Sequence, residues 1–99
     1  MTEKDAMKMI EASLGKLKTD EMIAQDTVIS GSLPLLGSGS PLDSIGFVAF
    51  LTDLEERISI EANKEIYLVL NEISEFNINQ SHLLVEQLAR HLVKVSDEN

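Results

Sequence analysis

Three stretches of the chain repeat apolar residues at spacings of three and four, which is typical of helices that bury one face. The first stripe consists of Met7, Ile10, Leu14 and Leu17, the second of Phe47, Leu51, Leu54 and Ile58, and the third of Val85, Leu88, Leu92 and Val95. On the second stretch, Ile45, Ala49, Thr52, Asp53 and Glu56 fall on the side opposite the stripe, so we expect them to face solvent.

Capping signals support two of these helices. Thr2 and Asp5 have the spacing of a helix N-terminus, although Gly15 lowers the helix propensity of the first stretch by about 1 kcal/mol relative to alanine. For the last helix, we expect the cap at Asn79 or Ser81. Leu83 and Leu84 would then widen its apolar stripe, and Arg90 and Lys94 suit the negative end of its dipole.

A fourth helix is predicted between the second and third stretches. Residues 66–70 form a continuous apolar run, which fits either a buried strand or a buried helix. The spacing of Ile66, Val69, Ile73 and Phe76 favours a short helix.

Residues 27–42 carry no charge and hold most of the chain's glycine and proline, so they predict a long first loop. The loop also contains six apolar side chains, at positions 28, 29, 33, 35, 36 and 42, so we expect it to pack on the domain. We therefore predict one all-α domain over residues 1–99, a small four-helix bundle with a long first loop and a short third helix.

Charge and composition narrow the function. The chain has 99 residues with 17 acidic and 8 basic side chains, a formal charge of −9, which argues against a binder of nucleic-acid phosphates and favours basic protein partners. There is no cysteine, so neither a disulfide framework nor a thiolate site is available. We see no apolar leader and no membrane-spanning run, so we expect a cytoplasmic protein with no membrane insertion.

The segment Leu42-Asp43-Ser44-Ile45-Gly46 stands where the loop becomes the second helix. Both Asp43 and Ser44 are preferred N-cap residues, and taken alone the pair indicates only a cap. The Ser44 hydroxyl would also lie at the positive end of a helix, where a bound anion would be stabilised. Gly46 in the first turn lowers helix propensity, but its missing side chain permits a close approach to the serine.

Together with Leu36-Gly37 upstream and Leu54-Glu55-Glu56 downstream, this segment resembles the acyl carrier protein family, and the helix layout extends the resemblance over nearly the whole chain. The resemblance implies that Ser44 receives a 4′-phosphopantetheine arm from coenzyme A through a phosphopantetheinyl transferase. Acyl groups would be carried on the arm as thioesters. The Leu-Asp-Ser-Ile-Gly version looks like stand-alone carriers of specialised lipid or secondary-metabolite pathways.

The same resemblance assigns roles around the serine. Asp43 would cap the helix and is a candidate contact for the magnesium-dependent transferase. Ile45, Asp53 and Glu56 are candidate contacts for acyl-loading and acyl-transferring enzymes with basic docking surfaces. We expect the carrier to be a monomer and not itself an enzyme.

The sequence departs from the family in the second helix and in the region of residues 60–80, which is longer than usual. Gly46 and Ala49 stand where typical members have acidic residues, and this predicts weak recognition by the ordinary fatty-acid synthesis enzymes. Phe47 stands where many carriers have a smaller residue, so its ring either belongs to the core or reduces the space that shelters an acyl chain.

Other chemistry is poorly supported. His82 and His91 are nine positions apart, too far along one helix for a compact metal site, and no nucleophile is paired with a base. Two alternatives to the acyl carrier stay open. One is an aminoacyl or peptidyl carrier, which the aspartate before the serine disfavours. The other is an acidic helical interaction module whose serine is never modified.

Overall fold

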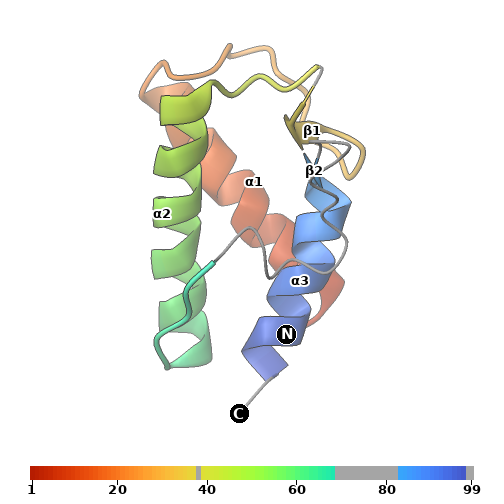
Figure 1. Cartoon of the computed structure of the whole chain (residues 1–99), viewed down its shortest axis with the longest axis vertical. Helices are drawn as coiled ribbons and strands as arrows, with labels where there is room; N and C mark the ends of the chain where they lie inside the picture. The colour runs from red at the N-terminus through yellow and green to blue at the C-terminus, as the bar shows by residue number, and fades with distance from the viewer. Residues whose placement is uncertain (38, 69–82, 98–99) are drawn as a thin grey trace.

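A computed structural model describes residues 1–37, 39–68 and 83–97. Within these ranges the chain forms three helices, α1 (Glu3–Thr19), α2 (Ser44–Ala62) and α3 (Val85–Asp97), and two short strands, β1 (Pro34–Leu36) and β2 (Leu83–Leu84). The α1 helix packs against both α2 and α3, which contact each other much less (Figure 1). The structure is therefore mostly helical, as predicted, with a short two-stranded sheet.

The start of α1 confirms the capping signal. The Asp5 amide donates to Thr2 Oγ1 at 3.1 Å, and the Thr2 amide donates to Asp5 Oδ2 at 3.1 Å. This reciprocal pair satisfies two amides that otherwise have no partner at a helix N-terminus. From there α1 buries Ile10, Leu14 and Leu17 of the predicted stripe, whereas Met7 is only half-buried and Ala6 is buried in its place.

The buried face of α2 is turned slightly from the predicted one. Phe47, Leu54 and Ile58 are buried as expected, but Phe50 is fully buried whereas Leu51 is only half-buried. Because of this rotation the buried face includes Gly46 and borders on Asp53. The surroundings of both residues therefore differ from the predicted ones, as described below.

The predicted long first loop is confirmed, and it packs on the domain as expected. It leaves the end of α1, reaches the start of α3 through β1 and returns to the start of α2 (Figure 1). Leu35 at the centre of β1 is completely buried, and Ile23 is buried as well. The loop therefore contributes to the core that the three helices share.

The prediction for residues 83 and 84 was wrong. Leu83 and Leu84 form β2, which pairs antiparallel with β1 in the register Leu36 with Leu83 and Pro34 with Leu84. The loop also accepts hydrogen bonds from the first turn of α3, from the Val85 amide to the Leu33 carbonyl at 3.0 Å and from the Glu86 amide to the Gly31 carbonyl at 2.9 Å. These nonlocal bonds explain why Leu83 and Leu84 are extended and why the fold is not purely α.

The fourth helix cannot be placed. Residues 69–82 lie outside the described ranges, and with them most of the predicted short helix, His82 and the predicted caps Asn79 and Ser81. The described part, residues 66–68, is not helical, although Ile66 and Leu68 are buried.

Candidate functional site

Asp43 alone caps α2. Its backbone is extended, with φ −87° and ψ −176°, and its Oδ1 accepts a hydrogen bond from the Gly46 amide at 2.6 Å. The Phe47 amide donates to the Asp43 carbonyl at 2.9 Å, which is the first bond of the helical ladder. The predicted cap is thus confirmed for Asp43, and Ser44 takes no part in it.

Ser44 is the first helical residue, and its side chain is exposed. Its hydroxyl forms no hydrogen bond with any residue that the structure describes. The amides of Ser44 and Ile45 belong to the first turn, where helix amides lack intrahelical acceptors. An exposed hydroxyl therefore stands at the positive end of a helix of 19 residues.

Two open hollows adjoin Ser44. One lies on the side of the first loop, has a volume of about 500 Å³ and is lined by Leu36, Gly37, Ser40, Leu42, Asp43, Ser44, Phe47 and Val48. The other lies on the outer side of α2, has a volume of about 450 Å³ and is lined by Ser44, Ile45, Val48 and Ala49. Ser44 and Val48 belong to both hollows.

Hydrogen bonds within the first loop hold the wall of the loop-side hollow. Ser40 Oγ donates to the Leu35 carbonyl at 2.8 Å and accepts from the Leu42 amide at 3.1 Å. Gly39 has a φ of +86°, which a residue with a side chain rarely adopts. The turn is therefore fixed both to β1 and to the segment that enters α2.

Gly46 has a different role from the one predicted. It is buried, and a Cβ atom there would lie 3.1 Å from Asp43 Oδ1 and 3.6 Å from Leu42 Cδ2. The missing side chain makes room for the cap of the same helix.

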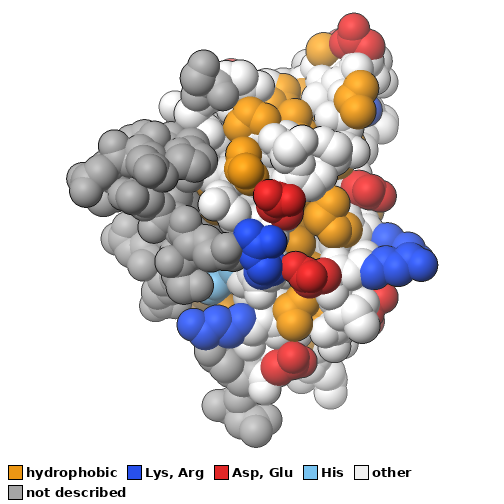
Figure 2. Space-filling view, turned by 90° about the vertical axis from the view of Figure 1, so that its right-hand side faces the viewer, with side chains coloured by type: hydrophobic (Ala, Val, Ile, Leu, Met, Phe, Trp, Pro, Cys, Tyr) orange, Lys and Arg blue, Asp and Glu red, His pale blue; other side chains and the backbone are white. Residues whose placement is uncertain are grey.

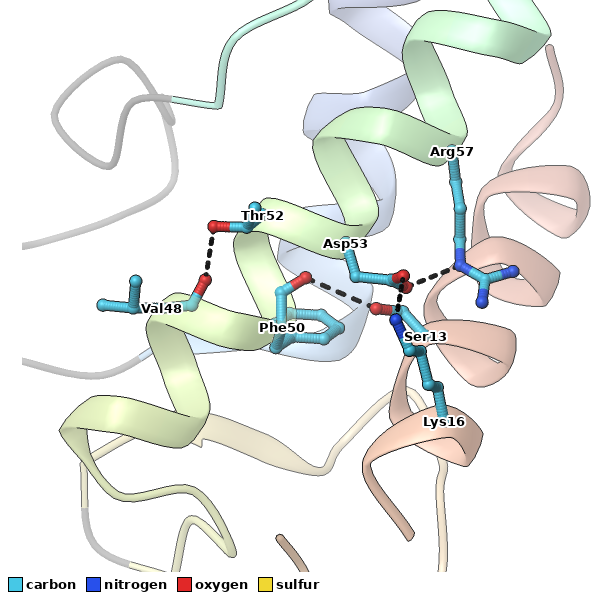
Figure 3. A network of polar contacts seen from close by, with 7 residues as sticks. All are labelled: Ser13, Lys16, Val48, Phe50, Thr52, Asp53 and Arg57. Atoms are coloured by element: carbon cyan, nitrogen blue, oxygen red, sulfur yellow. Dashed lines mark hydrogen bonds and ion pairs between the residues drawn. The ribbon is translucent and has the colours of Figure 1, made fainter. Parts of the chain in front are cut away.

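The three predicted partner contacts do not share one surface. Ile45 is 75% exposed and Glu56 is also exposed, as expected. The predicted placement of Asp53 is wrong, because only 17% of its side chain is exposed and it faces α1. Arg57 Nε donates to Asp53 Oδ2 at 2.6 Å, and Lys16 Nζ lies 3.6 Å from Asp53 Oδ1 (Figure 3).

The same contacts set the charge of Asp53. Burial acts to raise the pKa of the Asp53 carboxyl, but the hydrogen bond from Arg57 and the charges of Arg57 and Lys16 outweigh it, and the pKa lies below the ordinary 3.8. Beside it, the Ser13 hydroxyl donates to the Phe50 carbonyl at 3.3 Å and so links α1 to α2 (Figure 3). Asp53 is therefore an ionised bridge between α1 and α2.

The acidic side chains of α2 lie further from Ser44. Glu55, Glu56 and Glu65 line an open hollow of about 290 Å³ together with Tyr67. The Tyr67 hydroxyl donates to Glu65 Oε2 at 3.1 Å, which raises the pKa of Tyr67. From Ser44 to Thr52 the helix carries no charged residue, so its outer surface is apolar near the serine and acidic beyond Thr52.

Sequence reasoning did not assign Leu36, Leu42 and Val48 to the surroundings of the serine. For Val48 a signal exists, because it follows Ser44 by four positions and so lies on the same face of the helix. Leu36 and Leu42 reach the site through the path of the loop, for which the sequence offers no comparable periodicity.

Among the described residues, no group of three or more His, Asp or Glu side chains is arranged to hold a metal ion. His91 is buried on α3. Of the helices that the structure describes, none combines the length and the apolar character that a membrane crossing needs. Comparisons with protein-family models, with curated proteins and with solved structures find no match to this chain.

Proposed function

We propose that the protein is an acyl carrier whose Ser44 hydroxyl is converted to a 4′-phosphopantetheine phosphodiester. The observation that carries the proposal is the division of roles at the start of α2, where Asp43 provides the cap and the Ser44 hydroxyl is exposed and uninvolved. A serine needed only for capping would bond the amide of the second or third helical residue. Here the amide of the third helical residue, Gly46, is bonded by Asp43.

The residues around Ser44 fit a phosphodiester. The unpartnered amides of the first turn and the helix dipole favour an anion there, by about 0.3–1 kcal/mol at an exposed site. The Asp43 carboxylate is held against the Gly46 amide and so remains part of the helix cap. When bound, the arm would supply the thiol that this cysteine-free chain lacks, on which acyl groups are held as thioesters.

Attachment requires a phosphopantetheinyl transferase and coenzyme A. Ser44 Oγ would bond to the phosphorus that carries the pantetheine, lose its proton and release adenosine 3′,5′-bisphosphate. Asp43 is a candidate contact for the transferase. Glu55 and Glu56, further along α2, suit enzymes with basic surfaces, since opposite charge accelerates encounter.

The test is the intact mass of the protein after incubation with coenzyme A and a broad-specificity transferase. We expect a gain of one phosphopantetheinyl group in the wild type and in Ser32→Ala, which removes another exposed serine, and no gain in Ser44→Ala. An unchanged wild-type mass, with the transferase active on a known carrier, would favour the unmodified interaction module. Modification that persists in Ser44→Ala would contradict the assignment of Ser44 as the attachment residue.

A carrier of aminoacyl or peptidyl groups would give the same mass. The two cargo classes are separated by offering acyl-activating and aminoacyl-activating enzymes to the modified protein and measuring which group is transferred. We expect transfer of acyl groups.

A further inference from the structure

The side chain of Val48 separates the two hollows that adjoin Ser44. It is 63% exposed, and it lies on the side of α2 opposite Phe50, which points into the helix bundle (Figure 3). A group attached to Ser44 Oγ therefore has two surfaces to lie on. One faces the first loop, and the other faces outward past Ile45 and Ala49.

The loop-side hollow has the properties of a small-molecule subsite. Its volume of about 500 Å³ falls within the range of about 300–1,000 Å³ that is usual for ligand pockets, as does that of the outer hollow, so the walls distinguish the two. Leu36, Leu42 and Phe47 provide apolar walls, and the backbone turn at Ser40 is held by hydrogen bonds on both sides. The pairing of Leu36 with Leu83 fixes the far wall to β2. The hollow is therefore preformed.

The outer hollow has no comparable wall. Its lining residues all come from the first two turns of α2, and Ile45 stands 75% exposed above it. Ile45 and Ser44 line this hollow together, so a protein that docks on it contacts Ile45 beside Ser44. This side is therefore the accessible one for a protein.

Phe47 and Phe50 place two aromatic rings of α2 in the core. Phe47 is 8% exposed and Phe50 is fully buried, and their ring centroids are 6.4 Å apart. Phe47 also lines the loop-side hollow, so a group attached to Ser44 that enters this hollow meets the Phe47 side chain.

We propose that the loop-side hollow binds the pantoyl part of the arm, an inference that rests on the carrier function proposed above. This part bears two methyl groups on a carbon that is one methylene away from the phosphate ester oxygen, and it is the apolar group of the arm nearest to Ser44. Leu36, Leu42 and Phe47 receive these methyl groups, and Val48 keeps them from the outer side. The arm leaves Ser44 over the first loop, and the outer hollow stays free for the enzyme.

The test uses the carrier after modification, with its mass confirmed first. Nuclear Overhauser effects are measured from the two geminal methyl groups of the arm to the methyl groups of the protein. We expect cross-peaks to Leu36 and Leu42 and none to Ile45. Leu36→Ala should lose the cross-peaks to the loop, whereas the matched variant Ile45→Ala should keep them.

Each outcome has a definite meaning. Cross-peaks to Ile45 alone, or none to any side chain of the hollow, would overturn the inference while the mass still supports the carrier. An unmodified mass would overturn the carrier function and this inference together. Because the main measurement is made on the wild type, it does not depend on how well the Leu36 variant folds.

Discussion

At the scale of single residues, the start of α2 separates a structural role from a chemical one. Asp43 and Ser44 are both common N-cap residues, so the sequence does not say which of them caps the helix. The structure assigns the cap to Asp43, through the 2.6 Å bond to the Gly46 amide. The two neighbouring side chains should therefore respond very differently to truncation.

We predict that Asp43→Ala lowers the free energy of unfolding by about 0.5–2 kcal/mol, because the Gly46 amide loses its acceptor. Ser44→Ala should change it by less than about 0.5 kcal/mol, as expected for an exposed side chain without a partner. Urea denaturation of the two variants measures the difference. Equal losses in both variants would show that Ser44 shares the cap.

The two helical glycines provide a second comparison at this scale. At Gly15 a new Cβ atom meets nothing within 4 Å, so Gly15→Ala should stabilise the protein by about 0.5–1 kcal/mol. At Gly46 the new Cβ atom lies 3.1 Å from Asp43 Oδ1, so the same gain in helix propensity is offset by displacement of the cap. The midpoint temperature of thermal unfolding should be higher for Gly15→Ala than for the wild type. It should be lower for Gly46→Ala than for Gly15→Ala. The reverse order would mean that the Asp43 carboxylate adapts without cost.

At the scale of elements, apolar periodicity predicts what depends on local sequence and misses what depends on the path of the chain. The stripes located all three described helices, and Thr2 with Asp5 located the first residue of α1. The extended state of Leu83 and Leu84 depends on pairing with a strand almost fifty positions earlier. No helical wheel contains that information.

The error at Asp53 has a related cause. The wheel gives the angle between residues of α2, but contact with α1 decides where the border of the buried face lies. The spacing of Asp53 and Arg57 by four positions was a visible sign of an ion pair within the helix. What the sequence does not contain is that Lys16 of α1 reaches the same carboxylate.

We predict that Asp53→Asn destabilises the protein at neutral pH, by about 1 kcal/mol, because the partly buried carboxylate loses its charge toward Arg57 on the same helix and toward Lys16 of α1. Since the pKa of Asp53 is lower in the folded protein than in the unfolded chain, its contribution is complete above pH 3.8 and is lost as the pH falls through the folded value. The difference between the wild type and Asp53→Asn should therefore disappear in strong acid. Glu56→Gln, an exposed carboxylate on the same helix, is the control and should show little difference at either pH.

At the scale of the whole molecule, charged side chains are unevenly distributed along the described surface. On the side nearest α3, basic, acidic and apolar side chains alternate (Figure 2). Along α2 the first nine residues are uncharged. Glu55 and Glu56 lie further along the helix and line one hollow together with Glu65, which comes after the helix ends. A partner that approaches Ser44 therefore meets an apolar surface at the serine and an acidic one further along the helix.

This arrangement predicts two different salt dependences for the modification of Ser44 by a transferase with a basic surface. Replacing Glu55 and Glu56 by glutamine should lower the initial rate at low salt and should have little effect above about 0.1 M, where the Debye length is about 10 Å. Ile45→Ala should lower the rate by a similar factor at every salt concentration, because apolar contact is not screened. The control replaces Glu3 and Glu11 of α1 by glutamine, which changes the net charge equally but away from α2. If the control lowers the rate as much as the Glu55 and Glu56 variant, the partner senses total charge and the acidic end of α2 has no special role.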